Sequence, residues 1–305
     1  MTNNSATAPS SPFRSDCLHG KVALVTGGGS GICFEITKQL LLHGCDGVVI
    51  CGRREAFLQK ATDALSLLSK KPCYYSVCDV RDAESCRRAV NLTLEKFNGR
   101  LDILINGAAG NFLSTAETLK PKGFQTVMEI DAQGTFNMTH MAFNAMKNGG
   151  GGIVINITAT LQYGATWYQC HASAAKSAVD SLTRSLALEW GSDNIRVVGI
   201  APGPIADTPG TTKLAPGLDG EAVEELVKDG IPLGRMGKSW DIGMAAVYLC
   251  SSAGSYVTGD VLVVDGGEWL YRPPIGGVPK EMVSELSRRV EGKSRAQAPK
   301  LTSKL

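Results

Sequence analysis

Residues 21–42 read KVALVTGGGSGICFEITKQLLL, and this stretch decides the fold class. Its beginning, 21–27, is a short apolar run that predicts a buried strand, and the pattern over 31–43 predicts a helix. Glycines between them let the backbone turn sharply and approach a pyrophosphate at the helix N-terminus. We therefore expect a dinucleotide site, a merely tight turn being the alternative. Its expected residues are Gly27, Gly28, Gly29, Ser30, Gly31 and Ile32.

The rest of the chain continues this alternation of strand and helix. Short apolar runs that end in Gly, Asp or Asn are typical of strands buried on both faces. Six more such runs lie at 47–52, 72–80, 101–110, 151–160, 195–203 and 260–267. Helical patterns lie at 54–69, 82–98, 122–147, 169–190 and 240–251. The alternation predicts an α/β fold, a doubly wound parallel sheet (Rossmann) in a single three-layer α/β/α domain.

Three regions follow from composition along the chain. Residues 1–19 are rich in Ser, Thr and Pro and are expected to be a disordered tail. The folded domain is expected to span 20–270, with the Pro- and Gly-rich segment 203–235 as a substrate loop. A C-terminal extension, 271–305, carries Ser303-Lys304-Leu305, which reads as a peroxisomal address for an import receptor. A frayed polar tail is the alternative.

Overall composition excludes several classes of protein. Lys and Arg exceed Asp and Glu by 31 to 29, a net charge of +2, so no nucleic-acid partner is indicated. No apolar run approaches the roughly 18 residues of a spanning helix. Nine cysteines form no C-x-x-C pair and four histidines show no ligand spacing with them. We therefore expect reduced thiols and no metal site.

The second strand indicates which dinucleotide binds. It ends in Cys51 and Gly52, where an unmodified ribose would usually meet an acidic residue, and Arg53 and Arg54 follow. Two guanidiniums suit a ribose phosphate, which predicts NADPH/NADP, although solvated arginines would look the same. Other strand ends supply further candidates for cofactor binding, namely Asp79, Val80, Asn106 and Ala108.

Four motifs in order resemble the short-chain dehydrogenase/reductase family over residues 20–270. They are T-G-x-x-x-G-I at 26–32, N-x-A-x-G at 106–110, IAPGP at 200–204 and VDGG at 264–267. Cys33 replaces the usual last glycine of the first motif, where a side chain is expected to crowd the helix against the strand. The resemblance implies a homo-oligomer. It also implies that Pro202, Gly203, Ile205 and Thr208 grip the nicotinamide carboxamide.

The catalytic residues usual in this family are mostly changed. Lys176 matches the lysine that holds the nicotinamide ribose, but Ala172 occupies the tyrosine position and Ala159 the serine position. Asp131 stands where the family has asparagine. An alkoxide product needs a donor in direct contact, so ordinary ketone reduction is disfavoured. Conjugate addition of hydride to an unsaturated thioester gives a delocalised enolate instead, which hydrogen bonds can stabilise.

This altered set, with AAGNF at 108–112 and INITAT at 155–160, is similar to the family branch that reduces 2,4-dienoyl-CoA in peroxisomes. That resemblance implies catalytic roles for Asp131 and Lys176, which orient a water that protonates the substrate α carbon after hydride reaches the δ carbon. The expected product is a 3-enoyl-CoA. The residues expected to bind substrate are Asn111, Phe112, Lys120 and Lys122.

Several alternatives remain open from the sequence. Tyr163 and Tyr168 lie near the altered motif and are possible donors, although aromatic packing is the more usual role. His171, beside Ala172, looks like a substitute base but lies one residue round the helix, about 100° from the face that carries Ala172 and Lys176. Asp131 and Lys176 would also suit a purely structural ion pair. A catalytically inactive NADPH-binding scaffold, or another peroxisomal enoyl-CoA or 3-oxoacyl reductase, are the rival functions.

Overall fold

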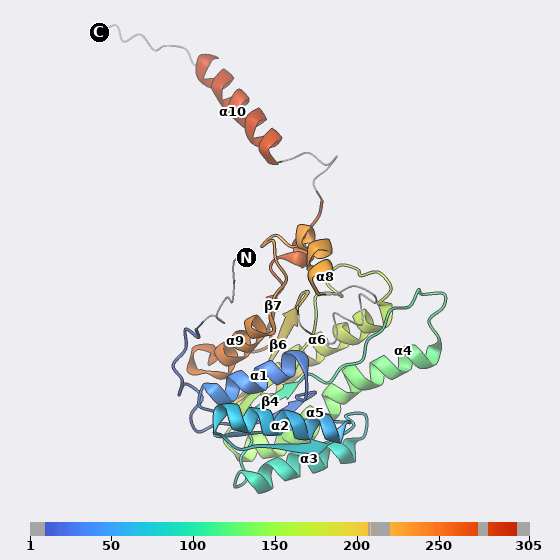
Figure 1. Ribbon diagram of the computed structural model, residues 1–305, viewed down its shortest axis with the longest axis vertical. Helices are drawn as coiled ribbons and strands as arrows, with labels where there is room; N and C mark the ends of the chain where they lie inside the picture. The colour runs from blue at the N-terminus through green and yellow to red at the C-terminus, as the bar shows by residue number, and fades with distance from the viewer. Residues whose placement is uncertain (1–9, 207, 209–219, 274–279, 298–305) are drawn as a thin grey trace, which may run out of the picture. The chain divides into compact units, whose positions relative to one another are not determined.

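The computed structural model describes residues 10–206, 208, 220–273 and 280–297 of the 305-residue chain. Its contacts divide the chain into two units, Met1–Trp269 and Leu270–Leu305. The first unit holds the sheet and the site discussed below (Figure 1). Ser303-Lys304-Leu305 and, within the predicted substrate loop 203–235, residues 207 and 209–219 lie outside the described residues.

The first unit is built on a seven-stranded sheet in the order β3-β2-β1-β4-β5-β6-β7. All neighbouring strands pair in parallel. The strands are β1 (Val22–Thr26), β2 (Gly47–Gly52), β3 (Cys73–Val77), β4 (Ile103–Asn106), β5 (Gly152–Ile157), β6 (Ile195–Pro202) and β7 (Val261–Val264). Each lies within or at the start of a predicted apolar run, so the doubly wound parallel sheet is confirmed.

Helices cover both faces of this sheet. One face packs against α1 (Gly31–Leu42), α2 (Glu55–Ser69) and α9 (Ser239–Cys250). The other face packs against α3 (Ala83–Lys96), α5 (Gly134–Asn148) and α6 (Cys170–Trp190). The remaining helices are α4 (Pro121–Met128), α8 (Gly220–Val227) and α10 (Lys280–Gln297). The three-layer architecture is therefore confirmed (Figure 1).

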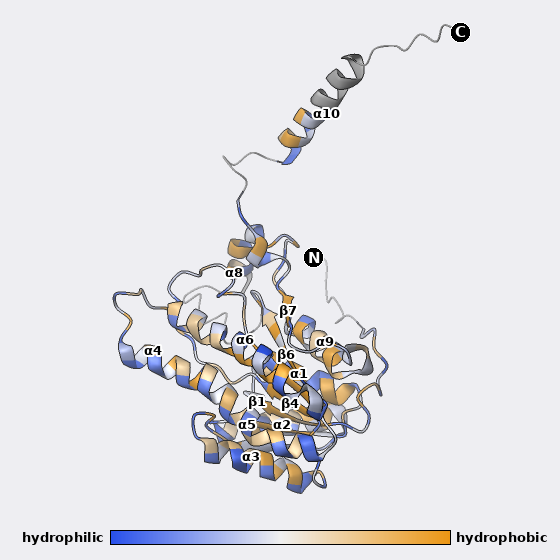
Figure 2. Ribbon diagram, turned by 180° about the vertical axis from the view of Figure 1, so that it is seen from behind, coloured by the Kyte–Doolittle hydropathy of each residue, from blue (hydrophilic) through white to orange (hydrophobic). Residues whose placement is uncertain are grey.

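Two hydrophobic cores result from the alternation of side chains along each strand. In β1, Ala23 and Val25 enter the core with α1 and α9, whereas Leu24 enters the core with α3 and α5. Residues in β4 and β5 alternate in the same way. Because both faces are covered, the strands are mostly apolar, with Ser76, Asn156 and Arg196 among the exceptions. Figure 2 shows mostly hydrophobic strands between helices that have a hydrophobic and a hydrophilic side.

The strand order reverses between β1 and β4, and this reversal locates the site. In open parallel sheets, loops on either side of such a reversal separate and leave a crevice at the carboxyl ends of the strands. The glycine loop follows β1, and residues 107–112 follow β4. Both predicted halves of the site therefore lie at the same edge of the sheet.

The expected disordered tail is wrong for its described part, 10–19. Leu18 is fully buried and its N–H donates to the carbonyl of His43. Ser11 hydrogen-bonds the ring of His43, and Phe13 packs edge-on against the same ring. Phe13 and Leu18 are apolar and pack against the end of α1. The composition of the segment alone does not reveal this contact. The folded domain thus begins before residue 20.

The predicted helix over 122–147 is also interrupted. Between α4 and α5 the structure places a π-helical turn, Glu129–Gln133, in which the N–H of Gly134 donates to the carbonyl of Glu129. Turns of this kind are rare in proteins, and those that occur are often found at functional sites. Asp131 lies at its centre.

The second unit contains α10, whose first part exposes Met282, Val283 and Leu286. This helix falls within the region that the sequence assigned to a C-terminal extension. Of the helices described, none combines the length and apolar character that crossing a bilayer requires.

Candidate active site

Asp131 and Lys176 form a buried ion pair at the centre of the site. Lys176 Nζ lies 3.1 Å from Asp131 Oδ2, and their side chains are only 11% and 2% exposed. The second carboxylate oxygen, Oδ1, accepts the N–H of Gly110 at 2.7 Å. Lys176 Nζ also donates to the carbonyl of Ile157 at 3.0 Å. The pairing expected from the sequence is present, and main-chain groups from two strand ends fix both members.

The π-helical turn explains how Asp131 reaches this position. Gly134 packs so tightly that a β carbon there would lie 2.5 Å from Val80 Cγ2, which anchors the start of α5. The wider turn before it changes the direction of the side chains without ending the helix. Asp131 consequently faces Gly110 and Lys176 from the neighbouring loop and helix.

The positions of the usual tyrosine and serine are filled by packing residues. Ala172 is 2% exposed and belongs to a small apolar cluster with Val127 and Ala175. Beside Ala159, Thr158 donates to Asp180 at 2.7 Å, and Gln162 donates to the same carboxylate. The hydroxyl nearest the serine position is therefore committed to a buried partner. The described site has no phenol or hydroxyl in the two usual places.

The glycine loop fits a dinucleotide. Gly27 has φ +70°, and a β carbon there would lie 2.9 Å from the carbonyl oxygen of Gly107, so backbone approaches backbone closely. Thr26 Oγ1 accepts the N–H groups of Gly107 and Ala108, which ties the two loops together. Ser30 starts α1 without a side-chain cap, and the first turn holds no acidic residue. This helix N-terminus retains the donors that a pyrophosphate needs.

Cys33 does not crowd the glycine loop in the way that the sequence suggested. The thiol is 5% exposed and occupies the space opposite Gly107, where a β carbon would overlap the sulfur. Burial raises the pKa of Cys33 to about 12, so the group stays a neutral thiol. The missing side chain at Gly107 thus compensates for the extra side chain at position 33.

Restoring the family glycine at this position is expected to weaken the protein. Cys33→Gly should lower the free energy of unfolding by about 2 kcal/mol, because glycine disfavours the helix and an unfilled space replaces the thiol. Denaturant unfolding measures the loss, and Cys33→Ala, which keeps the helix propensity, should lose less. Unchanged stability together with tighter NADPH binding would mean that the thiol does crowd the loop.

The arginines after β2 are exposed, and their surroundings differ. Arg54 lies over the ring of Phe57 at 4.0 Å. Within the described residues Arg53 has no ion-pair partner, although it is near enough to Asp79 to help lower the pKa of that carboxyl. Asp79 itself is bound by Arg81, with Nε 3.0 Å from Oδ1, and this contact contributes most to the lowered pKa. Arg53 is therefore the freer cation for a ribose phosphate.

The remaining predicted cofactor residues fall into two groups. Asn106 turns its side chain into the protein, where it donates to Thr139 at 2.7 Å and to Asn156 at 2.9 Å. Only the backbone of this strand end can meet a cofactor. The others lie at strand ends of the same edge, with side chains that are buried or half-buried: Val80, Ala108, Pro202, Gly203, Ile205 and Thr208.

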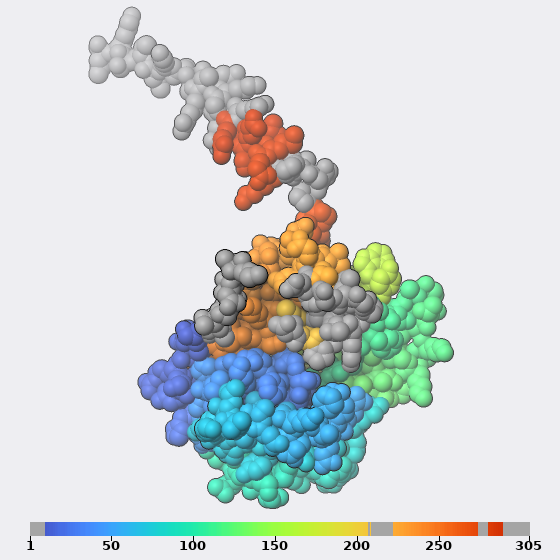
Figure 3. Space-filling view, in the orientation of Figure 1, coloured from blue at the N-terminus to red at the C-terminus, as the bar shows by residue number. Residues whose placement is uncertain are grey.

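The expected substrate side is a loop that is tied to the start of α6. Asn111 Nδ2 donates to Gln169 Oε1 at 2.6 Å, and the N–H of Ser114 donates to the carbonyl of Tyr168. Phe112 is 39% exposed. Lys120 and Lys122 are exposed at the start of α4. The segment that contains α4 forms the green part of the surface in Figure 3. These bonds join two segments that are far apart in the sequence, which is why sequence reasoning missed them.

His171 is enclosed to a degree that helical spacing does not predict. Its side chain is fully buried, and its ring lies against Phe112 with centroids 4.4 Å apart at 35°. Within the described structure neither ring nitrogen has a hydrogen-bond partner, an arrangement that costs about 1–3 kcal/mol. Burial lowers the pKa of His171, while the backbone of Phe112 and the charge of Asp131 act in the opposite direction.

The two tyrosines left open by the sequence lie in other surroundings. Tyr163 packs edge-on against Trp269, with centroids 5.4 Å apart, and its pKa is raised to about 12, chiefly by burial. Tyr168 is 51% exposed and lies beside Trp167. Tyr163 therefore lacks the lowered pKa that a lysine gives to the usual catalytic tyrosine.

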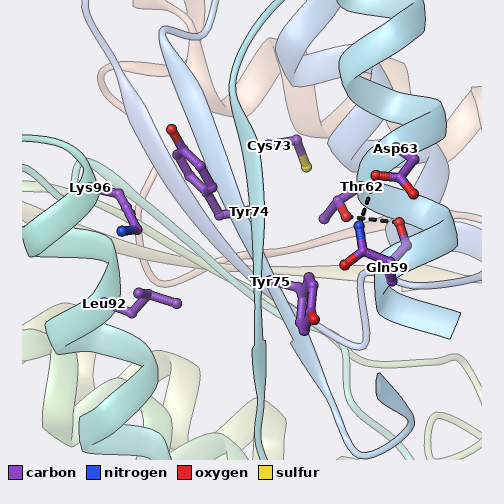
Figure 4. Close-up of a pocket in the computed structure, with 8 residues that line it drawn as sticks. All are labelled: Gln59, Thr62, Asp63, Cys73, Tyr74, Tyr75, Leu92 and Lys96. Atoms are coloured by element: carbon purple, nitrogen blue, oxygen red, sulfur yellow. Dashed lines mark hydrogen bonds between the residues drawn. The ribbon is translucent and has the colours of Figure 1, made fainter. Parts of the chain in front are cut away.

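A hollow of about 260 Å³ lies elsewhere, on the outermost strand β3. Figure 4 shows Tyr74 and Tyr75 on opposite sides of that strand, with Lys96 and Gln59 from the flanking helices. It is separate from the ion pair and does not belong to the site. Among the described residues, no group of three or more His, Cys, Asp or Glu side chains could hold a metal ion.

Comparison with known proteins agrees with this geometry. A family model described as enoyl-(acyl carrier protein) reductase matches residues 27–268. The chain is 52% identical to the peroxisomal 2,4-dienoyl-CoA reductase [(3E)-enoyl-CoA-producing] of Arabidopsis thaliana, over 97% of this chain and 99% of that protein. It is 45% identical to the Danio rerio protein of the same name, over 85% and 84%.

Solved structures give the same result for the fold. The 3-ketoacyl-(acyl-carrier-protein) reductase of Brucella melitensis, complexed with NADH, matches with a TM-score of 0.75 and 30% identity, over 83% of this chain and 99% of that chain. The sheet order, the glycine loop and the lysine position on α6 belong together in such proteins. The chain is therefore a member of the short-chain dehydrogenase/reductase family, in the branch that contains the peroxisomal 2,4-dienoyl-CoA reductases.

Proposed function

We propose that this protein reduces 2,4-dienoyl-CoA to (3E)-enoyl-CoA with NADPH, in peroxisomal β-oxidation of unsaturated fatty acids. One observation carries the proposal: the buried Asp131–Lys176 pair is intact although Ala172 and Ala159 replace the usual hydroxyl donors. An inactive scaffold would have no need to keep two charges buried at this cost. The relatives reported above are peroxisomal 2,4-dienoyl-CoA reductases, and this supports both the proposed substrate class and the proposed location in peroxisomes.

The missing donors fit the chemistry of a conjugated thioester. Reduction of a simple ketone creates an alkoxide, which is so basic that it needs an acid in direct contact. Bound NADPH supplies a hydride, and addition at the δ carbon of a dienoyl thioester leaves an anion spread over the diene and the carbonyl. Protonation of that anion occurs at carbon, and a water is a sufficient acid for it.

Asp131 and Lys176 are well suited to hold such a water. Lys176 uses two of its three N–H donors on Asp131 and Ile157, so the third remains for the ribose or for water. Asp131 keeps free lone pairs on both oxygens beyond those used by Gly110 and Lys176. In the proposed mechanism a water between them gives a proton to the α carbon, Lys176 gives a proton to the hydroxide that remains, and solvent then reprotonates Lys176.

The direct test is NADPH oxidation, followed at 340 nm, with 2,4-dienoyl-CoA esters of several chain lengths. We expect turnover with the dienoyl-CoA and none with simple ketones, and in heavy water one deuterium at the α carbon of a 3-enoyl product. NADPH binding without oxidation at any chain length would favour the inactive scaffold. Brisk reduction of a 3-oxoacyl-CoA would favour the other reductase.

Cofactor preference is proposed to come from Arg53. Arg53→Ala should raise the KM for NADPH by roughly 10- to 100-fold, since a hydrogen bond between charged groups contributes about 1.5–3 kcal/mol. The KM for NADH should change little. Arg54→Ala is the matched control, because Arg54 already lies on Phe57 and should matter less. Equal losses for both cofactors would argue against a ribose phosphate at this position.

The proposal also predicts that no tyrosine acts as the acid. Tyr163→Phe should leave the turnover of dienoyl-CoA within about twofold of the unmodified enzyme, since a phenol with pKa about 12 beside Trp269 is a poor donor. Tyr168→Phe should behave alike. Steady-state kcat for both variants is the measurement, and a fall of tenfold or more in either would restore a phenol to the mechanism.

Two further expectations belong to the proposal. Acyl-CoA is the small-molecule partner, and Ser303-Lys304-Leu305 is the segment that an import receptor would read. A homo-oligomer is expected from the family. Exposed apolar side chains on α5 and α6, among them Phe136 at 40% and Leu188 at 87% exposure, would be covered in such an assembly.

A further inference from the structure

His171 combines three features that the mechanism above leaves unused. Its imidazole is fully buried, and within the described structure both ring nitrogens are without hydrogen-bond partners. It is close enough to Asp131 for that charge to act on it. Its ring also stacks on Phe112, which belongs to the loop at the expected substrate side. The group is thus built into the site and not merely near it in sequence.

Packing alone does not explain a histidine at this position. A phenylalanine would stack on Phe112 equally well and would bury no polar atom. Native proteins leave few buried polar groups unpaired, and those that remain often belong to functional sites. The backbone of Phe112 lies near enough to the ring to act on its pKa, which leaves one nitrogen of His171 for a partner that arrives with a ligand.

The proposed reaction requires a donor for which no residue has yet been found. Hydride addition at the δ carbon drives negative charge toward the thioester oxygen, where a preorganised N–H or O–H group stabilises it. The two positions that usually supply such groups are Ala172 and Ala159. Thr158, next to Ala159, donates to Asp180, and Thr160 on its other side donates to Glu268 at 3.5 Å. Lys176 keeps one N–H beyond those on Asp131 and Ile157, and that N–H is assigned above to the ribose or to water.

We propose that His171 donates a ring N–H to the thioester oxygen of the bound dienoyl-CoA and stabilises the enolate that forms there. This role rests on the proposed function and adds a residue to it. Burial keeps the imidazole neutral at neutral pH, because it lowers the pKa of His171. A neutral imidazole can polarise a carbonyl without giving up its proton to the enolate oxygen.

Phe112 controls access to this donor. His171 lies one ring below Phe112, a side chain that solvent reaches over 39% of its surface. The backbone beside it is held, because Phe112 N–H donates to Asn111 and Asn111 donates to Gln169. Rotation of the Phe112 side chain alone would therefore uncover the imidazole while the loop stays in place.

The decisive variant is His171→Phe, which keeps the ring stack and removes the N–H. We expect kcat to fall about 10²- to 10³-fold, as it does when an oxyanion donor is lost. NADPH affinity should stay within twofold, and the melting temperature should be unchanged or higher, since an unpaired polar group has been removed. His171→Gln, which retains an N–H donor, should recover at least a tenth of the activity.

A spectroscopic readout tests the contact without turnover. In the complex with NADP⁺ and a dienoyl-CoA, the infrared C=O stretch of the thioester should shift to lower frequency in the unmodified protein and should not shift in His171→Phe. If that variant does not fold, His171→Leu, which also lacks the N–H, gives the same comparison with the unmodified protein. A kcat for His171→Phe within threefold, or an unshifted C=O band in the unmodified complex, overturns the proposal.

Failure of the proposed function would look different. If the unmodified protein oxidises no NADPH with any dienoyl-CoA, the function is wrong, whatever His171 does. If turnover is normal and the C=O band is unshifted, the function stands and the role of His171 falls. If the unmodified protein shows normal turnover and a shifted band, and His171→Phe loses both, then the proposed function and the role of His171 are both supported.

Discussion

Replacing Asp131 by asparagine is expected to lower the turnover of 2,4-dienoyl-CoA by about 100-fold or more. Asparagine has almost the same shape, and its Oδ1 can still accept the N–H of Gly110, as Asp131 does at 2.7 Å. It cannot serve as a proton acceptor or hold a water through a negative charge, and loss of such a group costs roughly 10²- to 10⁴-fold. The measurement is single-turnover NADPH oxidation, which separates chemistry from product release.

The binding of NADPH should survive this change. Cofactor contacts are expected at the glycine loop, at Arg53 and at the third N–H of Lys176, none of which involves Asp131 directly. Fluorescence titration with NADPH should give a dissociation constant within about threefold of the unmodified value. Asp193→Asn is the matched control, because Asp193 also pairs with a lysine but lies away from the site. Its Oδ1 is 2.9 Å from Lys147 Nζ. Unchanged turnover in Asp131→Asn would remove this carboxylate from the mechanism.

Much of the fold could be predicted because it depends on patterns within short segments. The helix expected over 31–43 is found at Gly31–Leu42, and the one expected over 169–190 at Cys170–Trp190. Strands covered on both faces are mostly apolar, so seven mostly apolar runs predicted seven strands. The positions of Asp131 and Lys176 came from matching family motifs, and the structure brings the two side chains together.

The features that sequence did not reveal depend on contacts between distant residues. The π-helical turn at Glu129–Gln133 depends on the packing of Gly134 against Val80, which lies in the loop after β3. Helical spacing correctly set His171 away from the face of Lys176, but spacing gives an angle and not the degree of burial. Only the position of Phe112 over the ring shows that His171 is enclosed beside Asp131.

Lys176→Met is expected to destabilise the fold as well as to abolish turnover. It leaves the Asp131 carboxylate, which is 2% exposed, buried without its cation. Removing one partner of a buried pair costs about 3–5 kcal/mol, whereas replacing both charges is often neutral. Denaturant unfolding of the cofactor-free protein measures this cost, because bound NADPH would add its own stabilisation.

Combining Lys176→Met with Asp131→Asn separates the structural from the chemical role of the pair. The double variant should regain more than half of the lost stability, because no uncompensated charge stays buried, yet its turnover should remain at least about 100-fold down. The half-exposed pair Lys147–Asp193 provides the reference cycle, with an expected coupling of roughly 0–1 kcal/mol. Stability and turnover that recover together would mean that the pair acts only by holding the fold. If stability recovers but turnover does not, the charged pair is needed for chemistry, because the fold then tolerates its absence and the reaction does not.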